Sequence, residues 1–368
     1  MSFIKKRGYL LLGRIGSIFL TLVLLLSGCS FFEKKQTQEP DRDAVDVQQE
    51  VEVLAENLSV PWSIDRVNQT FYISERTGSI VKITNRKIER QRVHLEKPLA
   101  EAAEAGLLGF VLDPQFSENH KAYAYYTYRD EKKGQFNRVV VLRTNGNEWT
   151  EAAILLDRIP SAAYHHGGRL KIGPDRKLYI TTGDATEPDL AQNVKSLNGK
   201  VLRMNLDGSI PADNPFPGSS VFSYGHRNPQ GLAWLGSRLY ASEHGQSAHD
   251  EINMIKSGMN YGWPVIQGQA KKAGMVTPLF QSGEKTWAPS GMAASNGKLY
   301  VAALRGNAVF RFDLARMRMK PVITGLGRIR DIFVDGEYLY FISNNTDGRG
   351  NPDETDDKLY RVLLKNGN

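Results

Sequence analysis

The sequence predicts an all-β fold, because strand-like runs recur along it while helix signals are nearly absent. Beyond the N-terminal 28 residues, no long run places apolar residues at i, i+3, i+4 and i+7 between capping residues. The 34 glycines and 16 prolines point the same way, since both residue types disfavour helices and are common in turns. Short strands joined by tight turns are therefore expected along most of the chain.

Six strand-like runs carry an aromatic residue at the same place. Their marker residues are Tyr72, Tyr123, Tyr179, Tyr240, Tyr300 and Tyr340. The markers are 51, 56, 61, 60 and 40 residues apart, close to the period of propeller blades. Most follow a tight turn such as Ser295-Asn296-Gly297, and most precede a second alternating run such as 308–312. The sequence thus predicts a six-bladed β-propeller of four-stranded antiparallel blades, and an ordinary β-sandwich array is the alternative.

A propeller protects its sheet edges by closing into a ring, which requires the two ends of the domain to meet. The first strand-like run lies near residues 51–54, and the last lies near residues 358–364. We therefore expect these two segments to pair.

The first 28 residues are predicted to be an export signal and not a part of the fold. Four basic residues accompany an apolar run at 15–26, which ends in Leu26-Ser27-Gly28-Cys29. This ending resembles a bacterial lipobox, so Cys29 is expected to be lipidated and to anchor the protein to the extracytoplasmic face of the cell membrane. The alternative is a buried free thiol behind an uncleaved anchor, and both interpretations export the protein.

The remaining chain is expected to consist of a tether at 29–50 and a propeller domain at 51–368. The tether is polar and charged with little apolar spacing, which is typical of a flexible segment. Removal of residues 1–28 leaves 43 basic against 40 acidic residues, so the mature protein is almost neutral. This balance argues against nucleic-acid binding, which would require a basic face on the domain.

The stretch most suggestive of chemistry is Tyr164-His165-His166-Gly167-Gly168-Arg169-Leu170. It is followed by Gly183-Asp184 and, about forty residues further on, by Tyr224-Gly225-His226-Arg227-Asn228. These motifs place a histidine, a carboxylate and an arginine-asparagine pair at the ends of predicted strands. Loops at strand ends commonly carry functional residues, so we expect these groups to face a common pocket.

The ordered motifs of residues 54–364 resemble those of the glucose/sorbosone dehydrogenase family, the soluble-type, aldose sugar dehydrogenase-like quinoproteins. Besides the stretches above, the resemblance is carried by Val60-Pro61-Trp62, Glu75-Arg76-Thr77-Gly78, Gly106-Leu107-Leu108-Gly109-Phe110, Asn198-Gly199-Lys200, Ser242-Glu243-His244-Gly245, Asn260-Tyr261-Gly262-Trp263-Pro264 and Arg328-Ile329-Arg330-Asp331. Family members are six-bladed propellers that use pyrroloquinoline quinone (PQQ) and calcium. The resemblance therefore implies oxidation of the anomeric hydroxyl of aldoses to lactones, by base-assisted hydride transfer to PQQ, with an external or membrane electron acceptor.

The resemblance assigns the catalytic base to His165, with His166 in a variable position. A histidine suits this role because its ordinary pKa of about 6.5 keeps a neutral fraction near neutral pH. The two residues are adjacent, so on a strand they would face opposite sides. Asp184 matches an acidic residue that supports the base, although it could equally be a turn carboxylate after Gly183.

The cofactor PQQ carries three carboxylates, which arginine recognises well. By resemblance, Arg227 and Asn228 contact the cofactor, and Arg227 also stabilises charge on the reduced quinone. Arg328 and Arg330 match a pair that holds cofactor carboxylates, and a solvated strand face is the alternative. Arg305 stands where the family commonly has lysine, which keeps the charge but changes the geometry.

The resemblance assigns the calcium ligands to the backbone carbonyls of Gly245 and Gln246, with Asp250 nearby. Many relatives have proline at the position of Gln246, so the shape of this loop is in doubt. Tyr261 is assigned to the cofactor pocket and Glu104 to the substrate, with a structural turn and a surface carboxylate as the respective alternatives. His244 suggests zinc, but no neighbouring histidine or cysteine pair accompanies it.

Two other functions remain open at this point. A calcium-dependent lactonase or related hydrolase can share the fold, but it would use several side-chain carboxylates around a metal. A non-catalytic binding propeller at the cell surface would be expected to have lost the histidine and arginines named above. The identity of the sugar and of the electron acceptor leaves no mark in the sequence, and a monomer is the default expectation.

Overall fold

The computed structural model describes residues 50–364, and the predicted signal peptide, Cys29 and nearly all of the tether lie outside the described residues. In chain order the elements are β1 (Glu52–Ala55), β2 (Pro61–Val67), β3 (Thr70–Glu75), β4 (Ser79–Thr84), β5 (Lys87–His94), β6 (Leu107–Leu112), α1 (Phe116–Asn119), β7 (Lys121–Asp130), β8 (Gly134–Thr144), β9 (Trp149–Pro160), β10 (Leu170–Ile172), β11 (Leu178–Thr182), η1 (Pro188–Gln192), β12 (Lys200–Met204), β13 (Val221–Tyr224), β14 (Pro229–Leu235), β15 (Arg238–Glu243), β16 (Glu251–Ile255), β17 (Phe280–Gln281), β18 (Pro289–Ser295), β19 (Lys298–Ala303), β20 (Ala308–Asp313), β21 (Arg318–Thr324), β22 (Ile329–Asp335), β23 (Tyr338–Ser343) and β24 (Leu359–Leu363). The expected all-β class is confirmed. Within residues 50–364, no helix has the length and apolar character needed to cross a membrane.

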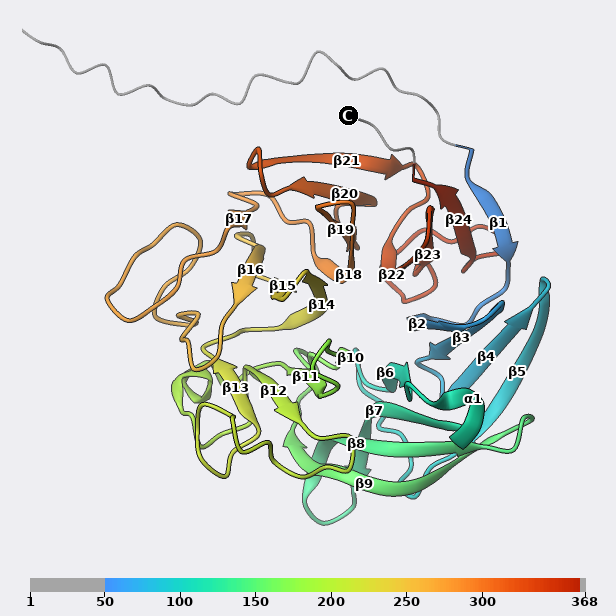
Figure 1. Cartoon of the computed structure of the whole chain (residues 1–368), viewed down its shortest axis with the longest axis horizontal. Helices are drawn as coiled ribbons and strands as arrows, with labels where there is room; N and C mark the ends of the chain where they lie inside the picture. The colour runs from blue at the N-terminus through green and yellow to red at the C-terminus, as the bar shows by residue number, and fades with distance from the viewer. Residues whose placement is uncertain (1–49, 365–368) are drawn as a thin grey trace, which may run out of the picture. The chain divides into compact units, whose positions relative to one another are not determined.

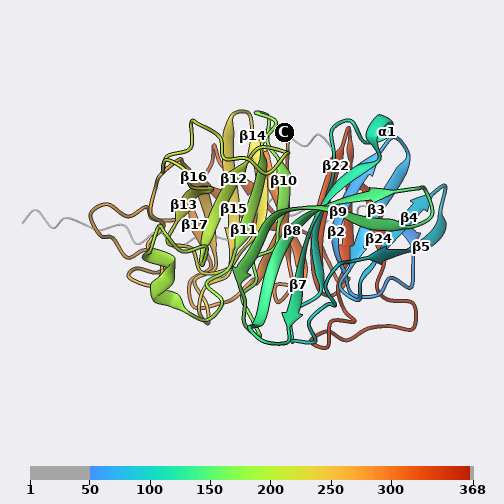
Figure 2. The ribbon, with the colours of Figure 1, turned by 90° about the horizontal axis from the view of Figure 1, so that it is seen from below.

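The strands form sheets that stand around a central axis, the arrangement of a β-propeller (Figure 1). Four sheets have four strands each, in the orders β10-β11-β12-β13, β14-β15-β16-β17, β18-β19-β20-β21 and β1-β24-β23-β22. Strands β10, β14, β18 and β22 lie nearest the axis, whereas β1 lies at the rim (Figure 1), and Figure 2 shows β10 beside β14 in the perpendicular view. The ends of these inner strands and their loops therefore surround the axis.

The fifth sheet has eight strands in the order β2-β3-β4-β5-β9-β8-β7-β6. Its two halves, β2 to β5 and β6 to β9, are each antiparallel. The strand pairing between the halves is a parallel contact of their outer strands, which pairs Val93 with Trp149 and His94 with Thr150. The sheet is therefore two four-stranded groups that touch at one edge.

The six marker tyrosines all lie in the second strand of a four-stranded group. These strands are β3, β7, β11, β15, β19 and β23. Every marker ring is at least nine-tenths buried. The second strand has a neighbour on each side, and its aromatic side chains pack between adjacent sheets, which explains why an aromatic recurs at this place.

The two ends of the described chain meet in one sheet. Strand β1 pairs antiparallel with β24, placing Glu52 opposite Arg361 and Val53 opposite Tyr360. Arg361 also donates a side-chain hydrogen bond to Glu52 across the pair. The predicted pairing of the first and last strands is confirmed, and it closes the ring.

A buried ion pair links four sheets at the centre. Arg169 and Asp331 are both fully buried, with Arg169 Nη1 2.8 Å from Asp331 Oδ2. The guanidinium of Arg169 also donates to Ser63 Oγ (3.1 Å) and to the carbonyl of Gln230 (2.8 Å), and it lies 4.2 Å from the ring of Trp62. Gly291 packs directly against Asp331, since a Cβ at this position would lie 1.7 Å from Asp331 Oδ1. The arginine of the His-His-Gly-Gly-Arg motif thus holds the fold together instead of facing the pocket.

Candidate functional site

A cavity of about 680 Å³ lies at the end of the inner strands, among the loops around the axis. Eight of the residues expected at a site line it: Glu104, His165, Arg227, Asn228, Gly245, Gln246, Arg305 and Arg328. These residues come from six separate loops spread over more than 220 positions of sequence. The structure therefore brings most of the predicted site residues together.

His165 lies in the loop before β10 and not on a strand. Its φ is 64°, in the left-handed region, so the expectation that His165 and His166 alternate across a strand does not apply. The loop packs closely on Gly183, where a Cβ would lie 1.8 Å from the carbonyl oxygen of His165. The two histidines nevertheless diverge, since His165 lines the cavity while His166 is buried beside Asn137 and Ser161.

The imidazole of His165 is held between an acceptor and a donor. Nδ1 lies 2.7 Å from Asp184 Oδ1, and Nε2 lies 2.9 Å from Arg227 Nη2. A carboxylate only accepts hydrogen bonds and a guanidinium only donates them. These contacts fit an imidazole that carries its proton on Nδ1 and directs the lone pair of Nε2 at Arg227, where a substrate hydroxyl in the cavity could take the place of the guanidinium. This is the form required of a general base.

Asp184 is fixed by several further donors. Its Oδ2 accepts from the indole of Trp263 at 2.9 Å, and its Oδ1 also accepts from the backbone of Thr186 at 2.9 Å. Its own carbonyl accepts from Asn198 Nδ2 at 2.8 Å. The residue is nearly fully buried, so its carboxylate serves both to shape the turn after Gly183 and to orient His165.

Lys200 holds the loop that follows Asp184. Its side chain is fully buried, and Nζ donates to the carbonyls of Leu190 (3.1 Å), Ala191 (2.9 Å) and Asn198. No carboxylate pairs with it among residues 50–364. The buried amino group of Lys200 therefore ties η1 to β12 through peptide carbonyls.

Arg227 connects the base to the loop after β15. Its Nη1 donates to the carbonyl of His244 at 3.4 Å, and its guanidinium lies 5.5 Å from the ring of Trp263. Its Nε is buried without a hydrogen-bond partner in the described protein. Burial lowers the pKa of this guanidinium from its usual value, which is the expected response of a cation withdrawn from water.

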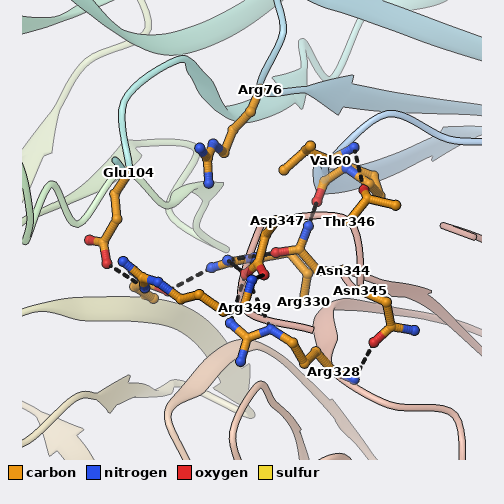
Figure 3. A network of polar contacts seen from close by, with 12 residues as sticks. Val60, Arg76, Glu104, Arg328, Arg330, Asn344, Asn345, Thr346, Asp347 and Arg349 are labelled. Atoms are coloured by element: carbon orange, nitrogen blue, oxygen red, sulfur yellow. Dashed lines mark hydrogen bonds and ion pairs between the residues drawn. The ribbon is translucent and has the colours of Figure 1, made fainter. Parts of the chain in front are cut away.

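Arg328 and Arg330 converge on one carboxylate, that of Asp347 (Figure 3). Nη2 of Arg328 lies 2.7 Å from Asp347 Oδ2, and Nη2 of Arg330 lies 3.8 Å from the same atom. Arg330 is otherwise bound by the neutral amides of Asn344 and Gln230. Burial lowers the pKa of Arg330 to about 9. Both arginines are buried, so the solvated-face alternative does not describe them.

Arg330 does not line the main cavity but an adjoining recess of about 20 Å³. The recess shares Glu104, His244, Leu304 and Arg349 with the main cavity, so the two spaces adjoin. Arg76 lines the recess as well and is bound by the carbonyls of Ala103 and Ala105. Cavity and recess together contain six arginines against three carboxylates, which makes the site electropositive.

The segment proposed for calcium lies in the loop after β15. The carbonyls of Gly245 and Gln246 accept no hydrogen bond from residues 50–364, so both are available as ligands. Asp250 instead anchors the loop, with Oδ1 accepting from the backbone of Gly245 and Oδ2 from Thr286, Trp287 and Ala288. Among the described residues, no group of three or more His, Cys, Asp or Glu side chains is arranged to hold a metal. The zinc alternative at His244 therefore has no ligand set there.

Tyr261 is not among the residues that line the cavity, so its assignment as a cofactor contact is not supported by its position. Its ring stacks on His226 at 4.7 Å, and its hydroxyl donates to the carbonyl of Met254 at 2.6 Å. The packing of an Asn-Tyr-Gly-Trp-Pro turn accounts for this burial. Arg305, by contrast, is exposed on the cavity wall, and its side chain has no hydrogen bond or ion pair with residues 50–364.

Four residues that shape the site were given no role from the sequence, although the first two stand in quoted motifs: Tyr164, Lys200, Asp347 and Arg349. Tyr164 adjoins His165 and is half-exposed at the cavity, so its neighbour in the motif could have drawn attention to it. Asp347 and Arg349 lie in the polar loop after β23, where only the glycines around them mark a turn. Nothing in the local sequence distinguishes them from solvent-facing charges.

Comparison with known proteins supports the same assignment of the chain. The Glucose / Sorbosone dehydrogenase family profile matches residues 58–361. Quinoprotein glucose dehydrogenase B of Acinetobacter calcoaceticus is 37% identical over 258 residues, which are 60% of this chain and 54% of that protein. The structure of a PQQ-bound aldose sugar dehydrogenase from Streptomyces coelicolor superposes with a TM-score of 0.79 at 35% identity, covering 85% of this chain and 98% of that one. A putative oxidoreductase (glucose dehydrogenase) from Thermus thermophilus gives a TM-score of 0.80 at 36% identity, covering 86% and 100%. The chain therefore belongs to the glucose/sorbosone dehydrogenase family.

Proposed function

We propose that the protein is a quinoprotein dehydrogenase that oxidises the anomeric hydroxyl of aldose sugars to lactones, with PQQ as its cofactor. The observation that carries this proposal is His165, a neutral histidine held between Asp184 and Arg227 on the wall of an arginine-rich cavity. The names of the relatives support the same chemistry for those proteins. Because the chain spans only about half the length of the Acinetobacter relative, the activity of the whole protein is stated as a proposal.

The residues present fit a tricarboxylate cofactor. The six arginines exceed the three carboxylates around the cavity and recess, and the buried Nε of Arg227 lacks an acceptor that an anionic ligand would supply. Arg227, Asn228, Arg305, Arg328 and Arg330 would hold the cofactor. When bound, PQQ supplies a two-electron acceptor for a hydride from the sugar.

The protein's own part in the reaction is proton transfer and electrostatic stabilisation. Nε2 of His165 would accept the proton of the anomeric hydroxyl as the C1 hydride leaves. The resulting imidazolium would be stabilised by Asp184, which already accepts from Nδ1. Arg227 lies within hydrogen-bond distance of the base and can stabilise negative charge that develops beside it.

We also propose calcium as a second cofactor, bound by the free carbonyls of Gly245 and Gln246. Oxygen ligands suit this hard cation, and a bound calcium would act as a Lewis acid in the electropositive cavity. The carboxylate of Asp250 is engaged by donors of the protein and is not proposed as a ligand. It holds the loop in which both carbonyls lie.

Reconstitution tests both cofactors together. The purified protein, incubated with PQQ and Ca²⁺ and given a panel of aldoses, is expected to reduce an artificial dye and to change the absorbance of the bound quinone. Chelation before reconstitution should abolish turnover. The two carbonyls that would bind calcium are uncharged, so they cannot replace the positive charge of the ion. No detectable PQQ binding at micromolar concentration would refute the proposal, whereas turnover resistant to chelation would refute only the calcium site.

The two alternatives fit the site less well. A hydrolase would require several carboxylates around a metal, but Glu104 and Asp250 on the cavity wall are both committed to hydrogen bonds within the protein. A binding propeller without catalysis would not need the His165–Asp184 pair, which is intact. Both alternatives would be favoured if the protein bound sugars or lactones but not PQQ.

We further propose that the fold has six blades. The proposal treats the two halves of the eight-stranded sheet as separate blades, since the strand pairing between them is limited to two residue pairs of β5 and β9. It is supported by the marker tyrosines, one of which lies in the second strand of each of the six groups.

We also propose that the mature protein is anchored by a lipid at Cys29 on the extracytoplasmic face of the cell membrane. The Leu26-Ser27-Gly28-Cys29 sequence supports this, and the tether would separate the propeller from the membrane. Cells fed a radiolabelled fatty acid should label the protein, and Cys29→Ser should abolish the label and release the protein from the membrane fraction. Equal membrane association of the variant would exclude a lipid anchor at this residue.

A further inference from the structure

Arg349 lies on the cavity wall beside the base, and no role is assigned to it above. Its Nη1 is 2.9 Å from Glu104 Oε1, an ion pair that joins loops 245 residues apart (Figure 3). Its guanidinium carbon lies 5.8 Å from the ring of Tyr164, the residue before His165. The side chain is 48% exposed, and its Nε and Nη2 have no hydrogen-bond partner among residues 50–364. Arg349 therefore keeps free donors at the cavity.

Glu104 ties this ion pair to the base. Its Oε2 accepts the backbone N–H of His165 at 3.1 Å while Oε1 is bound by Arg349. Burial alone would raise the pKa of Glu104, but the hydrogen bond and charge of Arg349 outweigh it and lower the pKa to about 2. The carboxylate is thus ionised at neutral pH, and the pair is neutral overall.

The loop of Arg349 is fixed relative to the arginines expected to hold the cofactor. The backbone N–H of Arg349 donates to Asp347 Oδ1 at 2.9 Å, and Oδ2 of the same carboxylate binds Arg328. A continuous series of hydrogen bonds therefore runs from Arg328 through Asp347, Arg349 and Glu104 to His165. The backbone of Arg349 and its Nη1 are thus both part of this series.

We propose that Arg349 is a specificity-determining residue that, together with Glu104, binds two adjacent hydroxyls of the sugar beside His165. A vicinal diol offers a donor and an acceptor at neighbouring atoms, which match the free lone pairs of Glu104 and the free N–H groups of Arg349. The half-exposed ring of Tyr164 flanks the same space. This inference rests on the proposed function and names its substrate class as aldoses with two adjacent free hydroxyls.

The test is Arg349→Met in the full-length, PQQ-loaded protein, assayed with an aldose and its monodeoxy analogues. KM for the parent sugar should rise about tenfold or more, as expected for loss of a charged hydrogen bond, with kcat within about threefold of wild type. The deoxy sugar that lacks the bound hydroxyl should be disfavoured by wild type but not by the variant. Arg349→Lys, which keeps the charge and one donor, should lie between the two.

Two controls separate recognition from a structural effect. The affinity for PQQ, followed by absorbance, should be unchanged in Arg349→Met. Arg316→Met removes another exposed, ion-paired arginine outside the cavity and should leave KM at the wild-type value. An unchanged KM in Arg349→Met, an equal penalty for all deoxy sugars, or a loss of PQQ affinity in place of the KM effect would overturn the proposal.

Sugar binding without turnover distinguishes this inference from the proposed function. If wild type oxidises no sugar with PQQ, the proposed function fails, and calorimetry of sugar binding to the protein decides the role of Arg349 alone. Weaker binding of the parent sugar to Arg349→Met than to wild type would then support the recognition pair. Equal binding to both proteins, or no binding to either, would contradict it.

Discussion

Replacing His165 with alanine is expected to lower kcat for sugar oxidation by about 10²–10⁴-fold, the usual contribution of a general base. The reason is geometric, since the contact to Asp184 keeps the proton on Nδ1, and the lone pair of Nε2, which now accepts from Arg227 at the cavity wall, is the one that a sugar hydroxyl would reach. Stopped-flow measurement of quinone reduction by a saturating aldose reports this step directly. The affinity for PQQ should stay within a few-fold of wild type, because the arginines that would hold it are unchanged.

Asp184→Asn provides a sharper form of the same experiment. An amide keeps the shape of the carboxylate, but it can donate to Nδ1 and so no longer enforces the proton on that atom. Reduction should slow substantially without loss of PQQ binding. His94→Ala, which removes a half-exposed histidine paired with Glu148, serves as the matched control and should have wild-type kcat. Near-normal kcat in His165→Ala would show that another group removes the proton.

Arg169→Met is expected to lower the free energy of unfolding by about 3–5 kcal/mol, because it leaves Asp331 as a buried charge without its partner. The Asp331 carboxylate would retain only the backbone N–H of Ile64 at 2.8 Å. Gln230 would also lose the donor to its carbonyl. Chemical denaturation, with Tm as a second measure, gives the difference from wild type.

The control for this prediction is again Arg316→Met, whose arginine is 62% exposed. An exposed ion pair contributes about 0–1 kcal/mol, so this variant should unfold almost as wild type does. Asp331→Asn should resemble Arg169→Met, because it too leaves one buried charge unpaired. A change below about 1 kcal/mol in Arg169→Met would mean that the centre relaxes or admits water around the carboxylate.

The repeating part of the fold was predictable from the sequence because it is local. An aromatic residue in the second strand packs between neighbouring sheets in every group, so Tyr72 and its five counterparts recur at similar spacing. The pairing of the chain ends followed from the need of a ring to close, and it is seen in β1 and β24. The edge contact of β5 with β9 was not predictable, since it joins only two residues of each strand and leaves no pattern.

The site was predictable where a residue belongs to a motif and not where its role depends on a distant partner. His165, Asp184 and Arg227 meet as expected, but the left-handed φ of His165 arises from packing on Gly183. The pairing of Arg349 with Glu104 spans 245 residues, and the three carbonyls around Lys200 are backbone atoms of a loop. Tyr261 was assigned to the cofactor pocket but lies in the core, because an Asn-Tyr-Gly-Trp-Pro turn is compatible with either position.

The pairing of β1 with β24 has a consequence for how the protein unfolds. In a linear repeat array each end is free, so terminal units can fray one at a time while the rest stay folded. Here the first strand completes the last sheet, and neither terminal group can detach without breaking a sheet made from both ends of the domain. The ring consequently has no free end at which unfolding can begin at a low cost in free energy. The described domain should therefore unfold in one cooperative step.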